Sequence, residues 1–350
     1  MTLWVAGSNA RGQLGTGDEE DSHGLKQVLF DLKGDQRAEP PGIVLEIACG
    51  SNHTLALIHA MPQLTVSLWG TGDGSRGQLG LSVSGSSLNV FKRLNLGEAL
   101  GSHELTMIQA SWESSFVVIR SENGDRILSF GSNEFGLLGT GESSLLHGIQ
   151  DVKIVHLFSN ESDAIRVTRL KVGPRNAFAV LRHQTIVGQR DMLVGWGAGR
   201  HGQLQMRELN DTTLRGPRQV ALPMRVMTWT HPTEVLDLSV GSQHALVLTS
   251  DNKIHQLGSN AKHQLPGDLS LGDVCIQRVL CSWNNSFILI QPSPNVWSIL
   301  SFGEGTYGQL GRDRDISNHS VVLPSLFEVH NVVCGSEHVL VVGKSVSGFV

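Results

Sequence analysis

Two short stretches near the start of the chain decide the fold. Residues 4–15 read WVAGSNARGQLG, an apolar run that meets a glycine and then a Gly-Gln-Leu-Gly turn. Residues 47–57 read IACGSNHTLAL, in which two apolar runs flank a small polar turn. Short apolar runs bounded by glycine-rich turns predict β-strands rather than helices.

Both stretches recur along the chain, and copies of the two motifs alternate. The first motif places its leading glycine at Gly7, Gly72, Gly131, Gly197, Gly258 and Gly303. A second glycine follows at Gly12, Gly77, Gly136, Gly202 and Gly308, whereas His263 replaces it in one copy. The second motif is centred on Gly50, Ser111, Gly173, Gly241, Ser282 and Gly335. Two motifs per repeat indicate a unit of about four strands.

The strands that follow the second motif are apolar at every position. Residues 116–119, 245–248 and 287–290 are examples. Such strands need cover on both faces, and no long capped helical segment is present to supply it. Similar sheets stacked around an axis cover one another, so the sequence predicts an all-β propeller with six visible blades in one domain, residues 1–350.

Composition narrows the class of protein further. Glycine accounts for 40 of 350 residues and charged residues for 17%, as expected for a turn-rich β protein. The formal net charge is -5 without a dense lysine or arginine run, which disfavours direct DNA binding. Neither a signal peptide nor an apolar stretch of membrane-spanning length occurs. We therefore expect a soluble protein of the cytoplasm and nucleus, not attached to a membrane.

Three copies of the first motif also match the dinucleotide-binding pattern G-x-G-x-x-G, at residues 72–77, 197–202 and 303–308. That pattern holds a pyrophosphate at the N-terminus of a helix. Each copy here leads into Gln-Leu without a helix signal. We interpret all the motif glycines as residues of tight turns with close backbone approach, and we expect no cofactor.

Three histidines occupy one position of the second motif. They are His53, His244 and His338, and the other copies carry Ser114, Asn176 and Asn285 there. A metal site needs several converging ligands, whereas Ser and Asn at the equivalent positions indicate a hydrogen bond that stabilises the turn. We expect no metal ion at these histidines.

The remaining candidates for chemistry are few. The four cysteines, Cys49, Cys275, Cys281 and Cys334, form no C-x-x-C pair or disulfide framework, and we expect all four thiols to be buried. Cys49, Cys281 and Cys334 precede the small residue of the second motif and are predicted to be small core residues. No G-x-S-x-G, H-E-x-x-H or Walker A pattern is present. We expect a protein without catalytic residues.

Trp112 and Trp283 stand where sibling repeats carry small or polar residues, which are Ser51, Pro174, Gln243 and Ser336. The blade itself does not require a large aromatic side chain in this turn. Each tryptophan either packs over a neighbouring blade or anchors a protein interface. The candidate partner-binding residues are Trp112, Glu113, Trp283 and Asn284. Irregular insertions at residues 16–41 and 205–234 are further candidates for recognition.

The alternating Gly-x-Asn-x-x-Gly-Gln-Leu-Gly and Cys-Gly-x-x-His units resemble the repeats of the RCC1 superfamily. The likeness extends over nearly the whole chain. Ser111-Trp112, residues 281–283, residues 302–311 and residues 334–338 resemble the fungal alpha-tubulin suppressor and secretion-regulating exchange-factor branch. The resemblance implies a seven-bladed propeller, whereas this sequence ends shortly after Gly335. Either the propeller has six blades or its C-terminal blade is missing, and we favour the second alternative.

The resemblance implies two functions. The first is a non-enzymatic adaptor that binds a small CSL-type zinc protein in diphthamide synthesis and in wobble-uridine modification of transfer RNA through Elongator. The second is a guanine-nucleotide exchange factor for a Ran-like or secretory small GTPase. We rank the adaptor first because no basic N-terminal arm and no identifiable wedge segment are present. We expect a monomer apart from this partner.

Overall fold

The structure, a computed structural model, describes residues 2–60, 65–80, 87–101, 103–142, 148–158, 164–185, 188–205, 216–269, 271–272, 274–293, 296–311, 320–322, 327–334 and 339–345. Strands dominate, and the described helices are 3-10 turns: η2 (Gly97–Ala99), η3 (Glu134–Gly136) and η4 (Val155–Leu157). One compact unit comprises Met1–Gln184, Val194–Gly197 and Gln219–Arg225, and the other comprises Thr185–Leu193, Ala198–Arg218 and Val226–Val350. Among the described residues, no helix has the length and apolar character needed to cross a bilayer.

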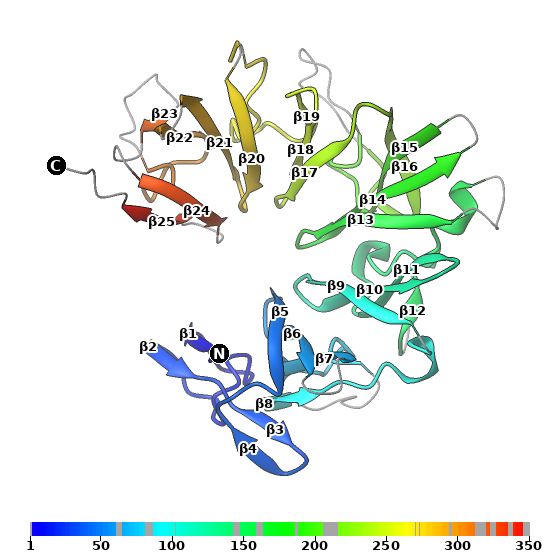
Figure 1. Cartoon of the computed structure of the whole chain (residues 1–350), viewed down its shortest axis with the longest axis vertical. Helices are drawn as coiled ribbons and strands as arrows, with labels where there is room; N and C mark the ends of the chain where they lie inside the picture. The colour runs from blue at the N-terminus through cyan, green and yellow to red at the C-terminus, as the bar shows by residue number, and fades with distance from the viewer. Residues whose placement is uncertain are drawn as a thin grey trace. The chain divides into compact units, whose positions relative to one another are not determined.

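The sheets follow one another along the chain (Figure 1). At the start, β1 (Trp4–Gly7) pairs with β2 (Ser22–Gln27). The next sheet contains β5 (Gly42–Cys49), β6 (His53–Ala60), β7 (Thr65–Asp73) and β8 (Ser87–Arg93) in that order, and β3 (Phe30–Leu32) and β4 (Asp35–Arg37) extend it beyond β8. It is followed by β9 (Glu104–Ala110), β10 (Ser114–Ser121), β11 (Gly124–Gly131) and β12 (Gln150–Asp151).

The later sheets repeat the same order. They are β13 (Ile165–Val172), β14 (Asn176–Thr185), β15 (Gly188–Ala198) and β16 (Gln219–Thr230); then β17 (Val235–Val240), β18 (His244–Thr249) and β19 (Ile254–Gly258); then β20 (Cys275–Cys281), β21 (Asn285–Ser293), β22 (Val296–Gly303) and β23 (Ser320–Val322). At the end, β24 (Phe327–Cys334) pairs with β25 (Val339–Ser345).

The predicted four-stranded unit is confirmed in four of these sheets, and the sheet β17–β19 departs from it. In the described part of that sheet no fourth strand pairs with β19. The two insertions also differ from the prediction, because much of each is regular structure. Residues 16–41 contain β2, β3 and β4, and residues 205–234 contain the long strand β16.

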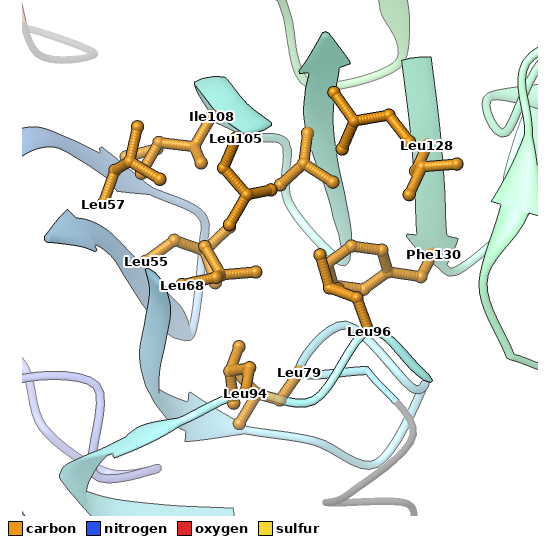
Figure 2. Close-up of a cluster of buried hydrophobic side chains, with 13 residues drawn as sticks. Leu55, Leu57, Leu68, Leu79, Leu94, Leu96, Leu105, Ile108, Leu128 and Phe130 are labelled. Carbon is orange, nitrogen blue, oxygen red and sulfur yellow. The ribbon is translucent and has the colours of Figure 1, made fainter. Parts of the chain in front are cut away.

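A continuous apolar core joins the sheets β5–β8 and β9–β12, as Figure 2 shows. Leu55 and Leu57 of β6 contribute from one sheet, and Leu128 of β11 contributes from the other. The strand β10 explains the continuously apolar runs in the sequence. Its Val117 and Ile119 enter this cluster, whereas the ring of Phe116 lies 6.4 Å from that of Trp196 on the other side. Both faces of such a strand are therefore covered.

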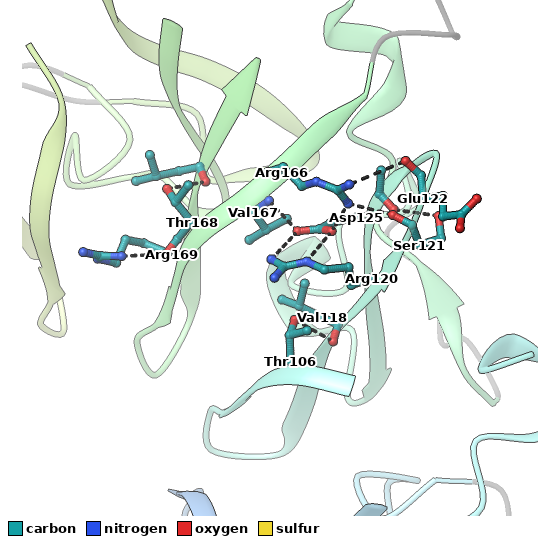
Figure 3. Close-up of polar contacts among 12 residues, drawn as sticks. Thr106, Val118, Arg120, Ser121, Glu122, Asp125, Arg166, Val167, Thr168 and Arg169 are labelled. Atoms are coloured by element: carbon teal, nitrogen blue, oxygen red, sulfur yellow. Dashed lines mark hydrogen bonds and ion pairs between the residues drawn. The ribbon is translucent and has the colours of Figure 1, made fainter. Parts of the chain in front are cut away.

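A buried carboxylate links the sheet β9–β12 to the sheet β13–β16 (Figure 3). Asp125 of β11 accepts hydrogen bonds from Arg120 Nε at 3.1 Å and Arg120 Nη2 at 3.0 Å. It also accepts one from Arg166 Nη1 at 2.9 Å and one from the backbone N–H of Val167, in β13, at 2.9 Å. The Asp125 side chain is fully buried, so two guanidinium groups and a backbone donor together compensate its loss of hydration.

Other acidic side chains bind backbone N–H groups of the following sheet in a similar way. Glu46 binds Ile108 N at 2.9 Å, Asp191 binds Val235 N at 3.2 Å, and Asp237 binds Val279 N at 3.1 Å. Burial raises the pKa of Glu46 above its usual value. Each acceptor satisfies a strand N–H that would otherwise lie unpaired between sheets.

Candidate functional site

In each sheet, two kinds of turn lie at the same end, and these turns are the candidate sites, since loops on a rigid scaffold commonly carry recognition. The glycine turn, residues 72–80 in the sheet β5–β8, follows the third strand. The hairpin turn, residues 50–52, joins the first two strands. Antiparallel pairing sets His53 opposite Gly72, and Ser114 opposite Gly131 in the next sheet, so the two turns meet.

The glycine turn is built on close backbone contact. Gly72 has φ of 101°, and an added Cβ would collide with the carbonyl of Asn52 in the hairpin turn. The N–H of Asp73 donates to that carbonyl at 2.7 Å. Gln78 then closes the turn, because its side-chain oxygen accepts the backbone N–H of Arg76 at 2.8 Å. This capping bond explains why the Gly-Gln-Leu-Gly motif contains a glutamine.

The same geometry recurs in the other sheets. Positive φ angles occur at Gly7, Gly12, Gly77, Gly131, Gly136, Gly197, Gly202, Gly303 and Gly308. Gln13, Gln203, Gln264 and Gln309 make the same capping bond as Gln78. Gly335 lies outside the described residues.

His53 is buried and links two sheets. Its Nε2 lies 2.9 Å from Ser115 Oγ, and that hydroxyl donates to the carbonyl of Gln78 at 2.7 Å. Because the hydroxyl hydrogen is already used, Nε2 carries a proton and donates it to the Ser115 hydroxyl. Burial lowers the pKa of His53 to about 4. Gly50 is needed beside this ring, since an added Cβ would collide with it.

A second histidine repeats this arrangement. His244 Nε2 lies 3.0 Å from Ser286 Oγ, Gly241 faces its ring, and burial lowers its pKa to about 4. His338 lies outside the described residues. Within the described ranges, no group of three or more His, Cys, Asp or Glu side chains is placed to share a metal ion.

The prediction that the cysteines are buried is wrong for two of them. Cys49 and Cys275 are exposed, while Cys281 and Cys334 are half-buried. Cys49 is the last residue of β5, and exposed residues alternate with better-covered ones along this strand. Ile47, for example, is exposed although it is apolar. The position of Cys49 in an apolar strand therefore did not ensure its burial. Desolvation raises the pKa of both Cys281 and Cys334 to about 12.

Trp112 packs against a residue of the following sheet. The guanidinium carbon of Arg175 lies 5.1 Å from the centroid of the Trp112 ring and 5.3 Å from that of Phe135. Trp112 and Arg175 stand in successive hairpin turns, and Phe135 stands in the glycine turn between them. We call these three residues the aromatic cluster. For Trp112 the structure therefore supports packing over a neighbouring blade, and the half-buried indole also retains accessible surface.

Sequence reasoning missed Phe135. This residue has φ of 62°, a conformation that costs a non-glycine residue about 1–2 kcal/mol. Its turn carries Leu137 where the sibling turns have the capping glutamine, and the backbone forms the 3-10 turn η3 instead. The replacement of the glutamine by Leu137 could have pointed to this turn, because a turn with leucine at this position cannot form the repeated capping bond.

The other candidate residues make polar contacts. Glu113 Oε2 lies 4.0 Å from Arg76 Nε, and the Glu113 carbonyl accepts Ser132 N at 2.8 Å. In the other compact unit, Asn284 Nδ2 donates to Glu304 Oε2 at 3.0 Å. Trp283 is half-buried, and its carbonyl accepts Ser242 N at 3.1 Å.

Known proteins share these repeats. A model of the regulator of chromosome condensation (RCC1) repeat matches residues 2–57 and 298–342. The ultraviolet-B receptor UVR8 of Arabidopsis thaliana is 27% identical over 302 residues, covering 83% of this chain and 60% of the receptor. An RCC1 repeat-containing protein of Schizosaccharomyces pombe is 31% identical over 226 residues, covering 61% of this chain and 54% of that protein. The chain thus spans little more than half the length of these two relatives.

Further relatives match a larger share of the chain. The secretion-regulating guanine nucleotide exchange factor of Bos taurus is 26% identical over 376 residues, covering 97% of this chain and 72% of that protein. Human WBSCR16 superposes with a TM-score of 0.52 at 15% identity, covering 99% of this chain and 100% of that chain. Prp20p of Saccharomyces cerevisiae also superposes with a TM-score of 0.52 at 15% identity, covering 99% of this chain and 92% of that chain. The structural likeness shows an RCC1-like β-propeller fold. The RCC1 repeat model and the relatives in known sequences support an RCC1 superfamily protein.

Proposed function

We propose that this protein is a non-enzymatic adaptor that binds a small protein partner through the turns that carry the aromatic cluster. The observation behind this proposal is the stacking of Arg175 over Trp112 and Phe135. Tryptophan and arginine are enriched among the residues that dominate binding energy at protein interfaces. The unfavourable φ of Phe135 adds support, because strained backbone tends to occur where function requires a side chain in place.

The partner we propose is a small zinc protein of the CSL type, acting in diphthamide synthesis and in wobble-uridine modification of transfer RNA. The resemblance of the Trp112 and Trp283 turns to the alpha-tubulin suppressor branch supports this choice. These roles would place the protein in the cytoplasm and nucleus.

A binding experiment with the purified zinc protein tests this proposal. Titration calorimetry with the full chain should give micromolar or tighter affinity, and Trp112→Ala should weaken binding by about 30-fold, or about 2 kcal/mol. Trp4→Ala is the matched control, because Trp4 is an exposed tryptophan of β1 outside the cluster. Absence of binding at micromolar concentration would remove the zinc protein as partner, and equal loss in both variants would remove the cluster as the binding site.

The second candidate function is guanine-nucleotide exchange, favoured by the relative in Bos taurus that bears this activity in its name and matches 97% of this chain. Such a function needs a protein surface and no conventional catalytic side chains. Release of fluorescent GDP from Ran-type and secretory GTPases, measured with and without the chain, decides between the two. Acceleration by several orders of magnitude that Trp112→Ala reduces would favour exchange over the adaptor.

A further inference from the structure

The sheet β17–β19 ends in a strand edge. In the four-stranded sheets, the fourth strand covers the equivalent edge. In the sheet β5–β8, the carbonyl of Leu68 accepts Leu94 N at 2.8 Å, just beyond the fourth strand β8. In the sheet β9–β12, the carbonyl of Ile127 accepts Val152 N at 2.9 Å, just beyond β12. Counted back from the first glycine of the turn, Ile254 holds the same position in β19. No described strand pairs with β19 on this side.

The hydrogen-bond register shows which groups this edge presents. Thr249 N donates to Lys253 O at 3.0 Å, which fixes the hydrogen-bonded pairs between β18 and β19. Because such pairs alternate along an antiparallel ladder, Val247 and His255 bond to each other, and the N–H and C=O groups of Ile254 and Gln256 point away from β18. These are the groups that a further strand would use.

The segment that follows the glycine turn of this sheet is bonded to a side chain of β19. Gln256 stands where the siblings have small residues, which are Gly70, Ser129, Gly195 and Ser301. Its amide nitrogen donates to Gly267 O at 2.5 Å, and its amide oxygen accepts Gly267 N at 3.1 Å. The described bonds between Gly267 and β19 are thus made by a side chain, and no described strand pairs with β19 there.

The space left beside the edge is a cavity of about 420 Å³. Ile254 and Gln256 line it from β19, Leu265 and Leu269 from the segment that Gln256 holds, and Ile276 from β20. A volume of this size lies within the range of ligand-binding pockets. The cavity thus combines apolar residues with polar ones such as Asn252 and Asp268, and along one wall it has a strand edge that no described strand covers.

We propose that β19 and this cavity bind an extended segment of a protein partner, which adds to the sheet as its fourth strand. The siblings indicate the occupant, because four of them hold an extended stretch of chain at this place. Backbone hydrogen bonds to Ile254 and Gln256 hold the segment, and an apolar side chain of the segment fills the space near Leu269 and Ile276. The site lies outside the unit that contains Trp112, and it does not depend on the proposed function.

Selection of random nine-residue peptides against the full chain, followed by fluorescence polarisation with the selected peptides, tests this proposal. Leu269→Arg, which puts a long charged side chain into the cavity, should weaken binding at least about tenfold. Leu25→Arg is the matched control, since Leu25 is exposed in β2, and it should leave binding unchanged. Failure to select any peptide that prefers the unaltered chain over Leu269→Arg would overturn the proposal.

Two further measurements distinguish strand addition from other binding and do not depend on a substitution. Two versions of a selected peptide should be made, one N-methylated at its odd-numbered residues and one at its even-numbered residues. One version should lose binding and the other should retain it, because only every second peptide N–H group faces the sheet. Amide exchange at Ile254 and Gln256 should slow on binding. Insensitivity to N-methylation, unchanged exchange, or loss of binding through Trp112→Ala instead of Leu269→Arg would each contradict the site.

Discussion

The sheets β5–β8 and β9–β12 are neighbours with the same strand order, yet their turns differ. In the first, Gln78 caps the glycine turn and the pair of Gly50 and His53 fills the hairpin turn. In the second, Leu137 replaces the capping glutamine, and Trp112 lies in the hairpin turn. Where the motif is retained, its residues stabilise the turn. Where the motif is altered, the turn presents side chains that the scaffold does not need.

The two sheets also differ in how each is linked to the next. Glu46 reaches the following sheet with bonds to the backbone N–H of Ile108 and the side chain of Gln109. Asp125 binds Val167 N and two arginines. The link from Asp125 brings a fully buried carboxylate and two guanidinium groups together, so we expect the contact that follows β9–β12 to be the more sensitive to loss of its carboxylate.

The largest effect should come from Asp125→Ala. The change leaves Arg120 and Arg166 without their carboxylate and Val167 N without an acceptor, so the free energy of unfolding should fall by about 3 kcal/mol or more. Urea denaturation measures this loss. Asp35→Ala removes an exposed ion pair and should change stability by less than about 1 kcal/mol. Similar losses in the two variants would mean that Asp125 is not a structural link.

Gly50→Ala should have the next largest effect. The new methyl group collides with the His53 ring and lies 2.5 Å from Ser111 O, so we expect a loss of about 1–3 kcal/mol. The double variant Gly50→Ala with His53→Ser should recover part of it, because the neighbouring hairpin turn combines Ser111 with Ser114. A double variant no more stable than Gly50→Ala would contradict the pairing of glycine with histidine.

The buried histidine predicts a pH dependence that the sheet β9–β12 lacks at this position. The pKa of His53 is about 4 in the folded protein and 6.5 when unfolded, so the unfolded state gains a proton first as the pH falls. Stability is therefore present above pH 6.5 and is lost toward pH 4, with a loss of about 2 kcal/mol between pH 7 and pH 5. His53→Asn should remove this part of the dependence in urea denaturation at both pH values. Identical pH profiles for the two proteins would show that His53 does not titrate as described.

The smallest effect concerns the two arginines near the turns. Arg175→Ala removes the cation above Trp112 and should lower the free energy of unfolding by about 0.5–1 kcal/mol. Arg76 Nε lies 4.0 Å from Glu113 Oε2, and both side chains are exposed. The free energy of unfolding of Arg76→Ala should therefore lie within about 0.5 kcal/mol of that of the unaltered protein. Equal values would mean that the stacking on Trp112 contributes no stability, and the difference is measured best by thermal unfolding of both variants in one buffer.

Much of the fold could be predicted from the sequence because the repeat encodes local geometry. A glycine before a turn, such as Gly72, reports a backbone conformation that few other residues adopt, and it does so wherever the motif recurs. The apolar run in β10 likewise reports that both faces are covered, since any uncovered face would be polar. Such signals are local and need no knowledge of distant residues.

The candidate site was predicted less well, because its features depend on pairs of residues far apart in the chain. Trp112 was recognised as unusual, yet Arg175 and Phe135 were not, since nothing in the sequence around either residue shows that it lies against the Trp112 ring. Asp125 was not recognised because a single acidic residue in a strand does not identify its donors. The missing partner of β19 was hidden for the same reason, as nothing around Ile254 indicates where the next stretch of chain lies.

By itself, the sequence determined the strands, the turns and the family, because glycine positions and apolar runs restrict the backbone within a few residues of where they stand. The tertiary structure alone decided that Arg175 covers Trp112, that Asp125 joins two sheets, that Cys49 is exposed and that no described strand pairs with the outer edge of β19. These features arise from contacts between segments that only the packing of the sheets brings together, and no local pattern encodes such contacts.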